Sequence, residues 1–299
     1  MNALDATGLR VTGANDPQKA FDALARVELV ISDCDGTLLH TDKSLGNAAK
    51  EAVSALRAAG VRFTVASSRP GKGMRAIVEA LAIDLPFAAY NGGKLVDPAD
   101  WKMLNAHLLS RAAVEAALQS LERDGIDAWV FIDDQWHITN PDGEYVPLER
   151  RTVGYDPVVV KRFEDADLDS VEKIVASSKD GDLLTRKNAE LDETLKGRAI
   201  TMRSQAYYLD ITHPDANKGA GIREIARLAG VPLENVAVLG DMSNDVAMFD
   251  VAGMSIVMGQ ASEEVQAHAT LVSATNDEDG FAMGLNGLLV ARKRGQRGV

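Results

Sequence analysis

The sequence predicts an α/β fold, with a Rossmann-like parallel sheet core, helices on both faces, and an inserted α+β cap domain. Apolar runs followed by amphipathic segments alternate near both ends of the chain, which is typical of parallel βα units. Between these ends lie all three tryptophans and several short β-rich runs, which indicate a separate antiparallel sheet. We therefore expect a core from residues 1–91 and 212–299 and a cap from residues 92–211.

Elements of the first half of the chain follow from apolar spacing and from helix start and stop signals. Residues 1–25 lack clear periodicity and are interpreted as an arm or a short leading helix. The predicted helix over 44–59 has Ser44 as its N-cap and stops at Gly60. The remaining predicted elements are strands at 27–32, 61–66 and 87–90 and a helix at about 72–82.

The middle of the chain has the pattern of a small α+β unit. Asp133-Asp134-Gln135 lies between two strand-like runs and predicts a hairpin loop. The aromatic residues of these strands are expected to pack in the cap rather than to stack on a ligand; they are Trp129, Trp136, Tyr207 and Tyr208. The predicted elements are strands at 128–133, 136–139, 171–177, 199–203 and 207–211 and helices near 110–124 and 183–196.

After Pro214 the βα alternation resumes. A helix opens at Lys218 and stops at Gly230, and the strand 236–239 leads into Gly240-Asp241-Met242-Ser243-Asn244-Asp245. Strand-like pieces at 255–258 and 270–272 are expected to complete the core sheet.

Composition and charge narrow the possible classes of function. The formal net charge of −12 argues against a nucleic-acid-binding surface, and the basic run Arg292-Lys293-Arg294 is expected to be a solvated end. No stretch approaches the roughly 18 consecutive apolar residues of a membrane span, and residues 1–10 lack the features of a signal peptide. With Cys34 as the single cysteine, an internal disulfide is excluded, and a cytoplasmic location is expected.

Two carboxylates follow the first buried strand of the core. Asp33 and Asp35 are two residues apart, so in an extended chain their side chains face the same way. A plain turn is the alternative, because Asp and Gly are common turn residues. A calcium loop is excluded by Thr37 at the next alternate position and by Ser44 at the end of a loop of about twelve residues.

Further polar residues stand at other strand ends and helix starts. They are Ser67, Lys218, and Asp241 with Asn244 and Asp245. In an open parallel sheet, ligands bind beyond the carboxyl ends of the strands, so we expect these distant positions to meet Asp33 and Asp35 in space.

Together these motifs resemble the haloacid-dehalogenase-like phosphohydrolases, and more narrowly the Cof-type branch, whose α/β cap is inserted after the third strand. The resemblance spans residues 26–290. It implies a Mg²⁺-dependent phosphatase acting on a small phosphorylated metabolite, such as a sugar phosphate. By the same resemblance, Asp33 would attack phosphorus to form an aspartyl-phosphate, and Asp35 would protonate the leaving oxygen and later accept a proton from water. That role requires a raised pKa for Asp35.

The resemblance also implies a ligand set for Mg²⁺. Its protein ligands would be the carboxylate of Asp33, the backbone carbonyl of Asp35 and the carboxylate of Asp241. Oxygen donors of this kind suit a hard cation. Asp245 would hold Lys218 or a metal-bound water in position.

The phosphoryl group would be bound by residues of several motifs. The resemblance assigns this role to Ser67 and Lys218, with Asn244, Asn91 and Gly92 approaching the same phosphate. Where the family usually has Thr-Gly-Arg, this chain has Ser67-Ser68-Arg69. The hydroxyl persists but the glycine is lost, so Ser68 could share the role of Ser67.

Several other residues have side chains that could act in catalysis, metal binding or substrate binding. A cysteine phosphatase would need an arginine where His40 stands, so Cys34 is expected to be a buried packing residue. The histidines show no metal-ligand spacing; they are His40, His107, His137, His213 and His268. Possible contacts to the leaving group from the cap are Asp134, Gln135, Lys187 and Arg203.

Two alternative functions stay open at this point. A phosphosugar mutase of the same fold would return the phosphoryl group to the sugar. A non-catalytic phospholigand-binding regulatory protein would be expected to lack at least one of Asp33, Asp35, Lys218 and Asp241, and all four are present.

Overall fold

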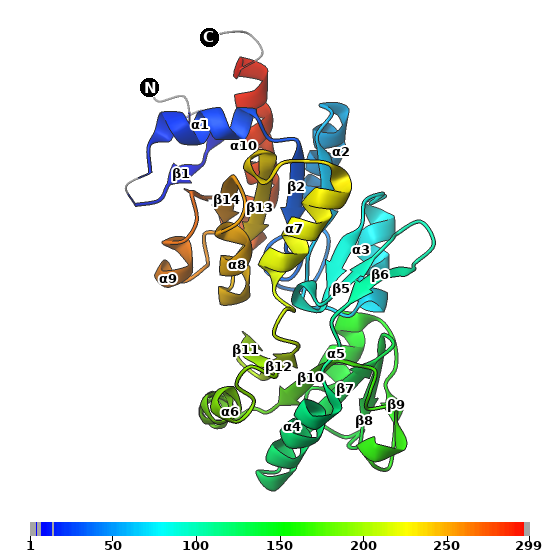
Figure 1. Ribbon diagram of the computed structural model, residues 1–299. Helices are drawn as coiled ribbons and strands as arrows, with labels where there is room; N and C mark the ends of the chain where they lie inside the picture. Colours follow the sequence, from blue (N-terminus) through cyan, green and yellow to red (C-terminus); the bar gives the residue numbers. More distant parts are fainter. Residues whose placement is uncertain (1–3, 5–6, 14, 296–299) are drawn as a thin grey trace.

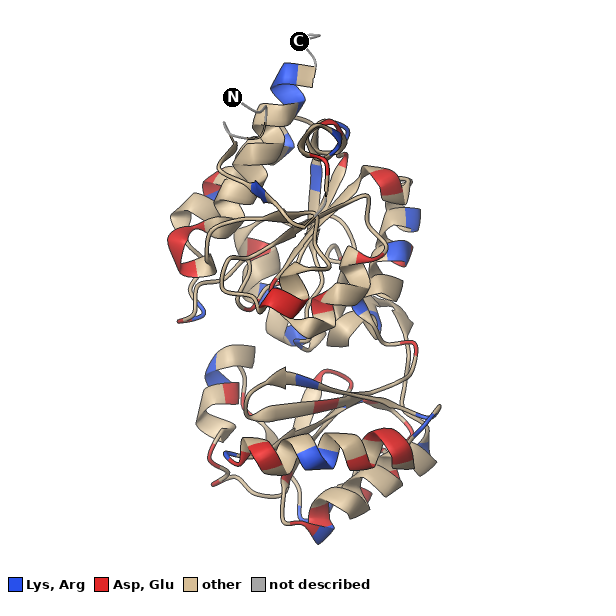
Figure 2. Cartoon of the chain, turned by 90° about the vertical axis from the view of Figure 1, so that its left-hand side faces the viewer, with Lys and Arg blue, Asp and Glu red and all other residues tan. Residues whose placement is uncertain are grey.

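The chain folds into two α/β parts, which we call the core and the cap (Figure 1). The computed structural model describes residue 4 and residues 7–13 and 15–295. The first and the last described segments of the chain lie on the core, and the cap is built from the middle of the chain. Lys and Arg are interspersed with Asp and Glu along the helices of both parts (Figure 2). Among the described residues, none of the helices has the length and apolar composition needed to span a membrane.

The core contains a six-stranded sheet in the order β1-β15-β14-β13-β2-β3. All neighbouring strands are parallel except β1, which pairs antiparallel with β15 at the edge. The predicted Rossmann-like parallel sheet is therefore confirmed. The strands are β1 (Arg10–Val11), β2 (Leu29–Ser32), β3 (Arg62–Val65), β13 (Val236–Gly240), β14 (Met254–Val257) and β15 (Leu271–Val272).

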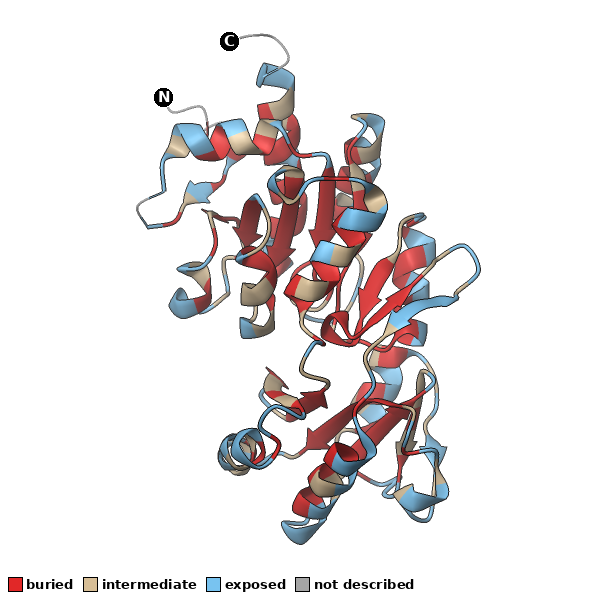
Figure 3. Ribbon diagram, viewed as in Figure 1, coloured by how far each residue is buried: buried red, intermediate tan, exposed pale blue. Residues whose placement is uncertain are grey.

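Helices cover both faces of this sheet because its strands are apolar on both sides. Within β2, Val30 packs into one hydrophobic cluster, and Leu29 and Ile31 pack into another. Figure 3 shows the resulting buried interior. The first cluster is covered by α1 (Pro17–Ala25), α2 (Asn47–Ala58), α3 (Arg75–Ala80) and α10 (Gly280–Gly295), and the second by α7 (Lys218–Ala229), α8 (Val246–Phe249) and α9 (Glu263–Gln266).

A small antiparallel sheet joins the core to the cap. It consists of β4 (Phe87–Ala89), β5 (Lys94–Val96) and β6 (Met103–Ala106). Leu95 and Val96 pack with the hydrophobic clusters of the core. The domain boundaries at residues 91/92 and 211/212 stay predictions, and this hairpin shows that the first residues after 91 contact the core.

The cap is a six-stranded sheet in the order β11-β12-β10-β7-β8-β9, antiparallel except for the β8–β9 pair. Its helices α4 (Arg111–Arg123) and α6 (Gly181–Thr194) pack on one face. On the other face lies an aromatic cluster that includes Tyr90 of the core and Val146 and Val153 of helix α5 (Val146–Val153). The strands are β7 (Asp127–Ile132), β8 (Gln135–Ile138), β9 (Val158–Val159), β10 (Val171–Ser177), β11 (Ile200–Gln205) and β12 (Tyr208–Thr212).

The structure corrects several details of the sequence prediction. The helix expected from Ser44 begins at Asn47 after Gly46, because Ser44 lies in a turn in which its backbone N–H donates to Asp42. The N-terminal segment supplies the edge strand β1 as well as the helix α1. The basic run near the C-terminus belongs to α10, and Arg292 donates a hydrogen bond to the carbonyl of Val27 at 2.8 Å.

Two further differences concern short elements. The helix expected over 72–82 is a 3-10 turn (Gly71–Met74) followed by the six-residue α3. The sequence pattern does not predict helix α5. It is stabilised by packing of Val146 and Val153 in the aromatic cluster, a long-range contact that its own sequence pattern does not reveal.

Candidate active site

The site lies at the carboxyl ends of three adjacent core strands. Because β13, β2 and β3 are neighbours, Asp241, Asp33 and Ser67 follow strands that lie side by side. The backbone N–H of Asp33 still donates to Leu239 of β13 at 2.8 Å, so the sheet ladder itself fixes the position of Asp33. The expected convergence of these strand ends is therefore present in the structure.

Lys218 brings the start of helix α7 into this group. Its buried ammonium lies 2.5 Å from Asp33 Oδ1 and also donates to Asp245 Oδ1. Asn217 caps the helix by accepting from the backbone N–H of Ala220 at 2.9 Å, which orients the first turn. The buried ammonium of Lys218 is thus held between two carboxylates.

Asp241 and Asp245 are fixed by the turn after β13. Asp245 Oδ2 accepts hydrogen bonds from the backbone N–H groups of Asp241 at 2.8 Å and Met242 at 2.9 Å. Thr37 donates to Asp241 Oδ1 at 2.9 Å from the loop after β2. The prediction that Asp245 holds Lys218 agrees with this contact geometry.

The carboxylates of Asp33, Asp241 and Asp245 are arranged as a possible cation site. One oxygen from each lies within 4.8 Å of the others, and all three residues are buried. Gly36, with φ of +84°, approaches Asp241 so closely that a Cβ would overlap its Oδ2. Three hard oxygen donors with a close backbone segment fit a hard divalent cation. Asp245 joins this group in addition to the predicted Asp33 and Asp241.

Among the described residues, Lys218 is the cation that acts on both Asp33 and Asp241, so the negative charges of this group exceed the positive ones. Burial raises the pKa of Asp33 to about 7, with Asp245 adding to the effect and Lys218 opposing it. Burial likewise raises the pKa of Asp241 well above its usual value, reinforced by the charges of Asp245 and Asp33. Three carboxylates therefore share one ammonium, and a further cation would relieve their repulsion.

Asp35 is in a different electrostatic environment from Asp33. Arg69 donates two hydrogen bonds to its carboxylate, at 2.6 and 2.8 Å, and Lys43 lies 2.9 Å away. Burial raises the pKa of Asp35, but Arg69 and Lys43 outweigh it and hold the pKa well below its usual range. The raised pKa expected for Asp35 is therefore wrong for this arrangement, because two cations from the loops after β2 and β3 stabilise its charged form.

The residues predicted to bind phosphate surround the same strand ends. Ser67 is fully buried, and its Oγ accepts from the backbone N–H of Arg69 at 3.2 Å. Asn244 donates to the side-chain oxygen of Asn91 at 2.9 Å, which links the motifs after β13 and β4. Ser68 is partly exposed and lines a small cavity instead.

The backbone at Asn91 and Gly92 is held in an unusual conformation. Both residues have positive φ, of 56° and 90°. A Cβ at Gly92 would overlap the carbonyl of Asn217, so a glycine is needed for this segment to lie against the start of α7. The strained turn positions Asn91 beside Asn244.

Long side chains from both the cap and the core connect the cap to the site. Lys173 on β10 donates to the carbonyl of Ser68 at 3.0 Å, and Arg69 donates to the carbonyl of Thr152 in α5 at 3.0 Å. Between these contacts lies a cavity of about 40 Å³, lined by Asp35 from the core and by residues that include Glu149 and Tyr208 from the cap. A leaving group next to Asp35 would face this cavity.

The four cap residues considered for leaving-group contacts lie elsewhere. Asp134 accepts from Gly71 N at 2.8 Å and pairs with Lys94 at 2.7 Å, so it ties the predicted β7–β8 hairpin to the core. Lys187 and Arg203 bond to other cap residues. The 40 Å³ cavity is lined by neither these three residues nor Gln135.

Two histidines form a pair that the sequence did not reveal. His107 and His213 lie in the two segments that join core and cap, with stacked rings 5.3 Å apart. With Asp215 they form a group whose ligand atoms lie within 4.8 Å of one another. The two histidines are far apart in sequence and show no metal-ligand spacing along the chain, so only the fold brings them together.

Sequence reasoning also missed two side chains that pair with Asp35, Arg69 and Lys43, and a third, Lys173, that lines the same cavity. Arg69 stands directly in the motif after β3, so its position was a usable signal. Lys43 and Lys173 come from a loop and from a cap strand without a motif of their own. Cys34, in contrast, is buried in the core cluster as expected.

Comparisons with known proteins agree on one family. A sequence model of the haloacid dehalogenase-like hydrolases matches residues 30–285. The chain is 26% identical over 290 residues to 5-amino-6-(5-phospho-D-ribitylamino)uracil phosphatase YwtE of Bacillus subtilis, covering 88% of this chain and 98% of that protein. It is 26% identical over 263 residues to pyridoxal phosphate phosphatase YbhA of Escherichia coli, covering 85% and 96%. A haloacid dehalogenase-like hydrolase from Bacteroides thetaiotaomicron has a similar crystal structure, with a TM-score of 0.79, 25% identity and coverage of 87% and 98%.

Proposed function

The chain belongs to the haloacid dehalogenase-like hydrolase family, and we propose that it is a Mg²⁺-dependent phosphatase that hydrolyses a small phosphomonoester through an aspartyl-phosphate. The observation that carries this proposal is the buried group of Asp33, Asp241 and Asp245 around Lys218 at the sheet edge. It supplies a nucleophile, a cation site and a fixed positive charge in one place. Relatives named as phosphatases of small phosphorylated metabolites support the reaction class.

In the first step, Asp33 attacks phosphorus and the bond between phosphorus and the alcohol oxygen breaks. Lys218 stabilises the negative charge on the phosphoryl oxygens, together with the hydroxyl of Ser67 and the amide of Asn244. Asp35 delivers a proton to the departing oxygen. The products are the free alcohol and a phosphoryl group bonded to Asp33.

In the second step, water attacks this phosphoryl group and Asp35 takes a proton from the water. The bond between phosphorus and the Asp33 oxygen breaks, which releases inorganic phosphate and restores the Asp33 carboxylate. The pairs of Asp35 with Arg69 and Lys43 stabilise the carboxylate form that this second step needs. The first step needs the protonated form, so we propose that substrate binding loosens these pairs. Closure of the cap, through Lys173 and Thr152, would limit access of bulk water.

Asp33, Asp241 and the backbone carbonyl of Asp35 are the proposed ligands of Mg²⁺, with Asp245 beside them. The ion supplies positive charge that allows a carboxylate to approach an anionic phosphate. The surplus of buried carboxylates and the close approach of Gly36 support this assignment.

A phosphate-release screen tests the function. Purified protein with Mg²⁺ should release phosphate from members of a panel of sugar, nucleotide and cofactor phosphates, and EDTA should stop the release until Mg²⁺ is restored. Asp33→Asn should lower turnover by about 10³-fold or more because the nucleophile is lost. Acid-quenched wild-type protein should carry a phosphoryl group on Asp33 by mass spectrometry. Turnover retained in Asp33→Asn would exclude the nucleophile assignment.

The same screen separates the two alternatives. An isomerised product formed without free phosphate would favour the mutase. Binding of phosphorylated ligands without turnover across the whole panel would favour a non-catalytic binding protein.

A further inference from the structure

Two segments of the chain, which we call the linkers, join the core to the cap. The first linker is residues 107–110, between β6 and α4, and the second is residues 213–217, between β12 and α7. Gly93 of the core contacts both. Its carbonyl accepts from the backbone N–H of His107 at 2.7 Å, and a Cβ on it would come within 2.9 Å of the Cβ of Ala216. The linkers therefore lie close together beside the core.

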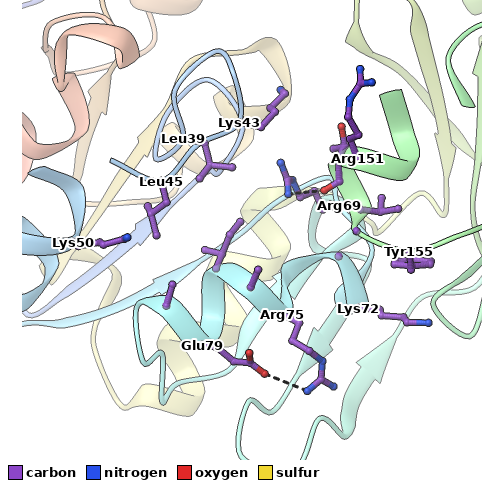
Figure 4. A pocket seen from close by; sticks show the side chains of 17 residues that line it. Leu39, Lys43, Leu45, Lys50, Arg69, Lys72, Arg75, Glu79, Arg151 and Tyr155 are labelled. Atoms are coloured by element: carbon purple, nitrogen blue, oxygen red, sulfur yellow. Dashed lines mark hydrogen bonds and ion pairs between the residues drawn. The ribbon is translucent and has the colours of Figure 1, made fainter. Parts of the chain in front are cut away.

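Away from the linkers, core and cap face each other across a cavity of about 620 Å³ (Figure 4). Core residues 69–80 line one side and cap residues 151–155 line the other. The Lys72 ammonium lies 4.4 Å from the centre of the Tyr155 ring across this boundary. A cavity of this volume leaves room for the two parts to approach or separate. Because hinges are a few loop residues, the linkers are where such a movement would be absorbed.

Three metal-ligating side chains converge where the linkers meet. They are His107 from the first linker and His213 and Asp215 from the second, and one ligand atom of each lies within 4.8 Å of the others. The two imidazole rings are stacked, with their planes at 22° to each other. Both histidines are half-buried and Asp215 is exposed, so an ion can reach the group from solvent.

His213 already presents an unprotonated nitrogen to this group. Its Nδ1 accepts from the backbone N–H of Asp215 at 3.0 Å and lies 3.8 Å from Asp215 Oδ2. In a neutral imidazole the accepting nitrogen carries no proton, and such a nitrogen is the one that binds a metal ion. A bound ion would replace the N–H as the partner of Nδ1.

The side chains need only a small rearrangement to hold an ion. Tetrahedral bonds of about 2.0–2.1 Å place the ligand atoms about 3.3 Å apart, so the group would contract by at most about 1.5 Å. The side chain of Asp215 is 72% exposed and that of His213 is 31% exposed. Rotation of these side chains can therefore bring the ligand atoms together.

Other histidines near carboxylates lack this convergence. His268 lies 3.7 Å from Asp250. His40 approaches Asp277 through Nδ1 and Asp279 through Nε2, so its two carboxylates are on different sides of the ring. Among the described residues, neither His268 nor His40 belongs to a converging group of three ligands.

The donor set of the linkers favours a different ion from the one proposed for the active site. The three carboxylates of the active site offer only oxygen, which suits Mg²⁺. Two imidazoles and a carboxylate suit a borderline ion such as Zn²⁺, Co²⁺ or Ni²⁺. With three protein ligands, Zn²⁺ would complete its coordination with water.

We propose that His107, His213 and Asp215 form a binding site for Zn²⁺, and that the bound ion joins the two linkers and restricts movement of the cap. The ion would connect residues that are more than a hundred positions apart in the chain and would do so at the point about which the cap moves. Binding of the ion is independent of the proposed function. Its effect on turnover rests on the proposed function.

Calorimetric titration of Zn²⁺ into the full-length protein tests the site. Excess Mg²⁺ is present throughout, so that it competes for the carboxylates of the active site. The wild type should bind one Zn²⁺ that His107→Ala and His213→Ala each bind about tenfold more weakly or worse, because one of three ligands is lost. Unchanged Zn²⁺ affinity in either variant would overturn the site.

His268→Ala is the matched control. The His268–Asp250 separation of 3.7 Å is nearly the same as the 3.8 Å between His213 and Asp215, but the pair is outside any converging group in the described structure. Its Zn²⁺ affinity should equal that of the wild type. An equal loss in His268→Ala would indicate unspecific binding to histidines and overturn the proposal.

Co²⁺ provides a second readout of the same site. Co²⁺ bound to imidazole nitrogen absorbs visible light, so its titration into the wild type should give an absorption band that is lost in His107→Ala. The same band in both proteins would place the ion elsewhere and overturn the assignment of His107.

Turnover tests the effect of the ion on the cap. With Mg²⁺ and substrate saturating, Zn²⁺ should lower kcat of the wild type by about twofold or more, since opening of a cap limits turnover in many enzymes of this design. Zn²⁺ should leave kcat of His107→Ala unchanged. Equal inhibition of both proteins, or none of either, would overturn the restriction of the cap. Absence of turnover in the wild type without Zn²⁺ would instead overturn the proposed function, and the calorimetric result for the site would stand.

Discussion

The core and the cap each contain a lysine with an almost fully buried ammonium, and the two have different partners. Lys218 in the core is 0% exposed and lies between Asp33 and Asp245, whose side chains are 7% and 0% exposed. Lys187 in the cap is 1% exposed, but its partners Asp124 and Glu190 are 33% and 38% exposed. One cluster is wholly buried, and the other is open to solvent on its acidic side.

The two clusters shift the pKa of their carboxyl groups in opposite directions. In the core, burial raises the pKa of Asp33 to about 7, despite the nearby ammonium. In the cap, the hydrogen bond from Lys187 lowers the pKa of Glu190 to about 2. A buried lysine alone therefore does not indicate a functional site. The distinguishing feature is a buried cluster whose carboxylates outnumber its cations, so that another cation or a reacting anion can alter the balance.

Replacing the two lysines gives the sharpest test of this comparison and the largest expected effect. Lys218→Met should lower kcat/KM by about 10²-fold to 10³-fold, because a charge at the phosphoryl group is lost. Lys187→Met should lower the free energy of unfolding by about 1 kcal/mol or slightly more, through lost hydrogen bonds, and leave kcat/KM within about twofold. Phosphate-release assays and urea unfolding measure both.

Circular dichroism must first show that Lys218→Met is folded, since it leaves three buried carboxylates without their ammonium. Lys218→Arg, which keeps the charge, provides a second variant for the same assay. If loss of Lys187 reduced activity as strongly as loss of Lys218, the proposed difference between the two clusters would be wrong.

Two glycines offer a second matched pair. Gly36 and Gly125 both have positive φ, but only at Gly36 would a Cβ meet Asp241, whereas at Gly125 nothing lies within 4 Å. Either alanine variant should cost about 1–2 kcal/mol of stability through backbone strain. Only Gly36→Ala should also lower kcat/KM, by roughly tenfold to 10²-fold, because it displaces a proposed metal ligand.

Isothermal titration with Mg²⁺ is an independent measurement for the glycine pair. Gly36→Ala should bind the ion more weakly than the wild type, and Gly125→Ala should bind it equally well. Equal Mg²⁺ affinity in all three proteins would remove Gly36 from the cation site.

The smallest expected effect comes from replacing Glu149, at the boundary between core and cap. It concerns how the stability of the protein depends on pH. Burial raises its pKa to about 7 from an ordinary value of 4.5, with Lys173 and Arg69 opposing and Asp210 and Asp35 reinforcing the shift. The folded state therefore binds more protons than the unfolded state between these values, and stability falls as the pH rises through this window.

Glu149→Gln cannot ionise, so its stability relative to the wild type should rise from pH 4.5 to above pH 7, by up to about 3 kcal/mol. Urea unfolding at several pH values measures the difference. Glu144→Gln, at an exposed glutamate that pairs with Lys179, is the control and should follow the wild type. A pH-independent difference for Glu149→Gln would contradict the assigned titration.

Much of the fold was predictable because it depends on local patterns. The alternation of apolar runs and amphipathic segments predicted the parallel sheet, and the strand-end motifs predicted the family and the enzyme class, all of which are confirmed. The roles of Asp33, Asp35, Lys218 and Asp241 stay predictions. The structure brings Asp33, Lys218 and Asp241 together as expected.

The features that the sequence did not predict share one physical origin. Helix α5 is stabilised by packing against the cap sheet. The His107–His213 pair forms because the fold brings two segments that are far apart in sequence next to each other. The contact of Arg69 with Asp35 likewise depends on how the loops after β2 and β3 fold over the sheet edge. Contacts of this kind have no periodicity along the chain.

The sequence by itself determined which polar residues stand at the strand ends and so which ones are candidates for the chemistry, because residue types and their order are local properties. Only the tertiary structure decided their charge states. Burial raises the pKa of Asp33, whereas Arg69 and Lys43 lower that of Asp35, although the two residues are separated only by Cys34. Electrostatic free energies depend on the distance and burial of all neighbouring charges, and these are set by the packing of segments far apart in sequence.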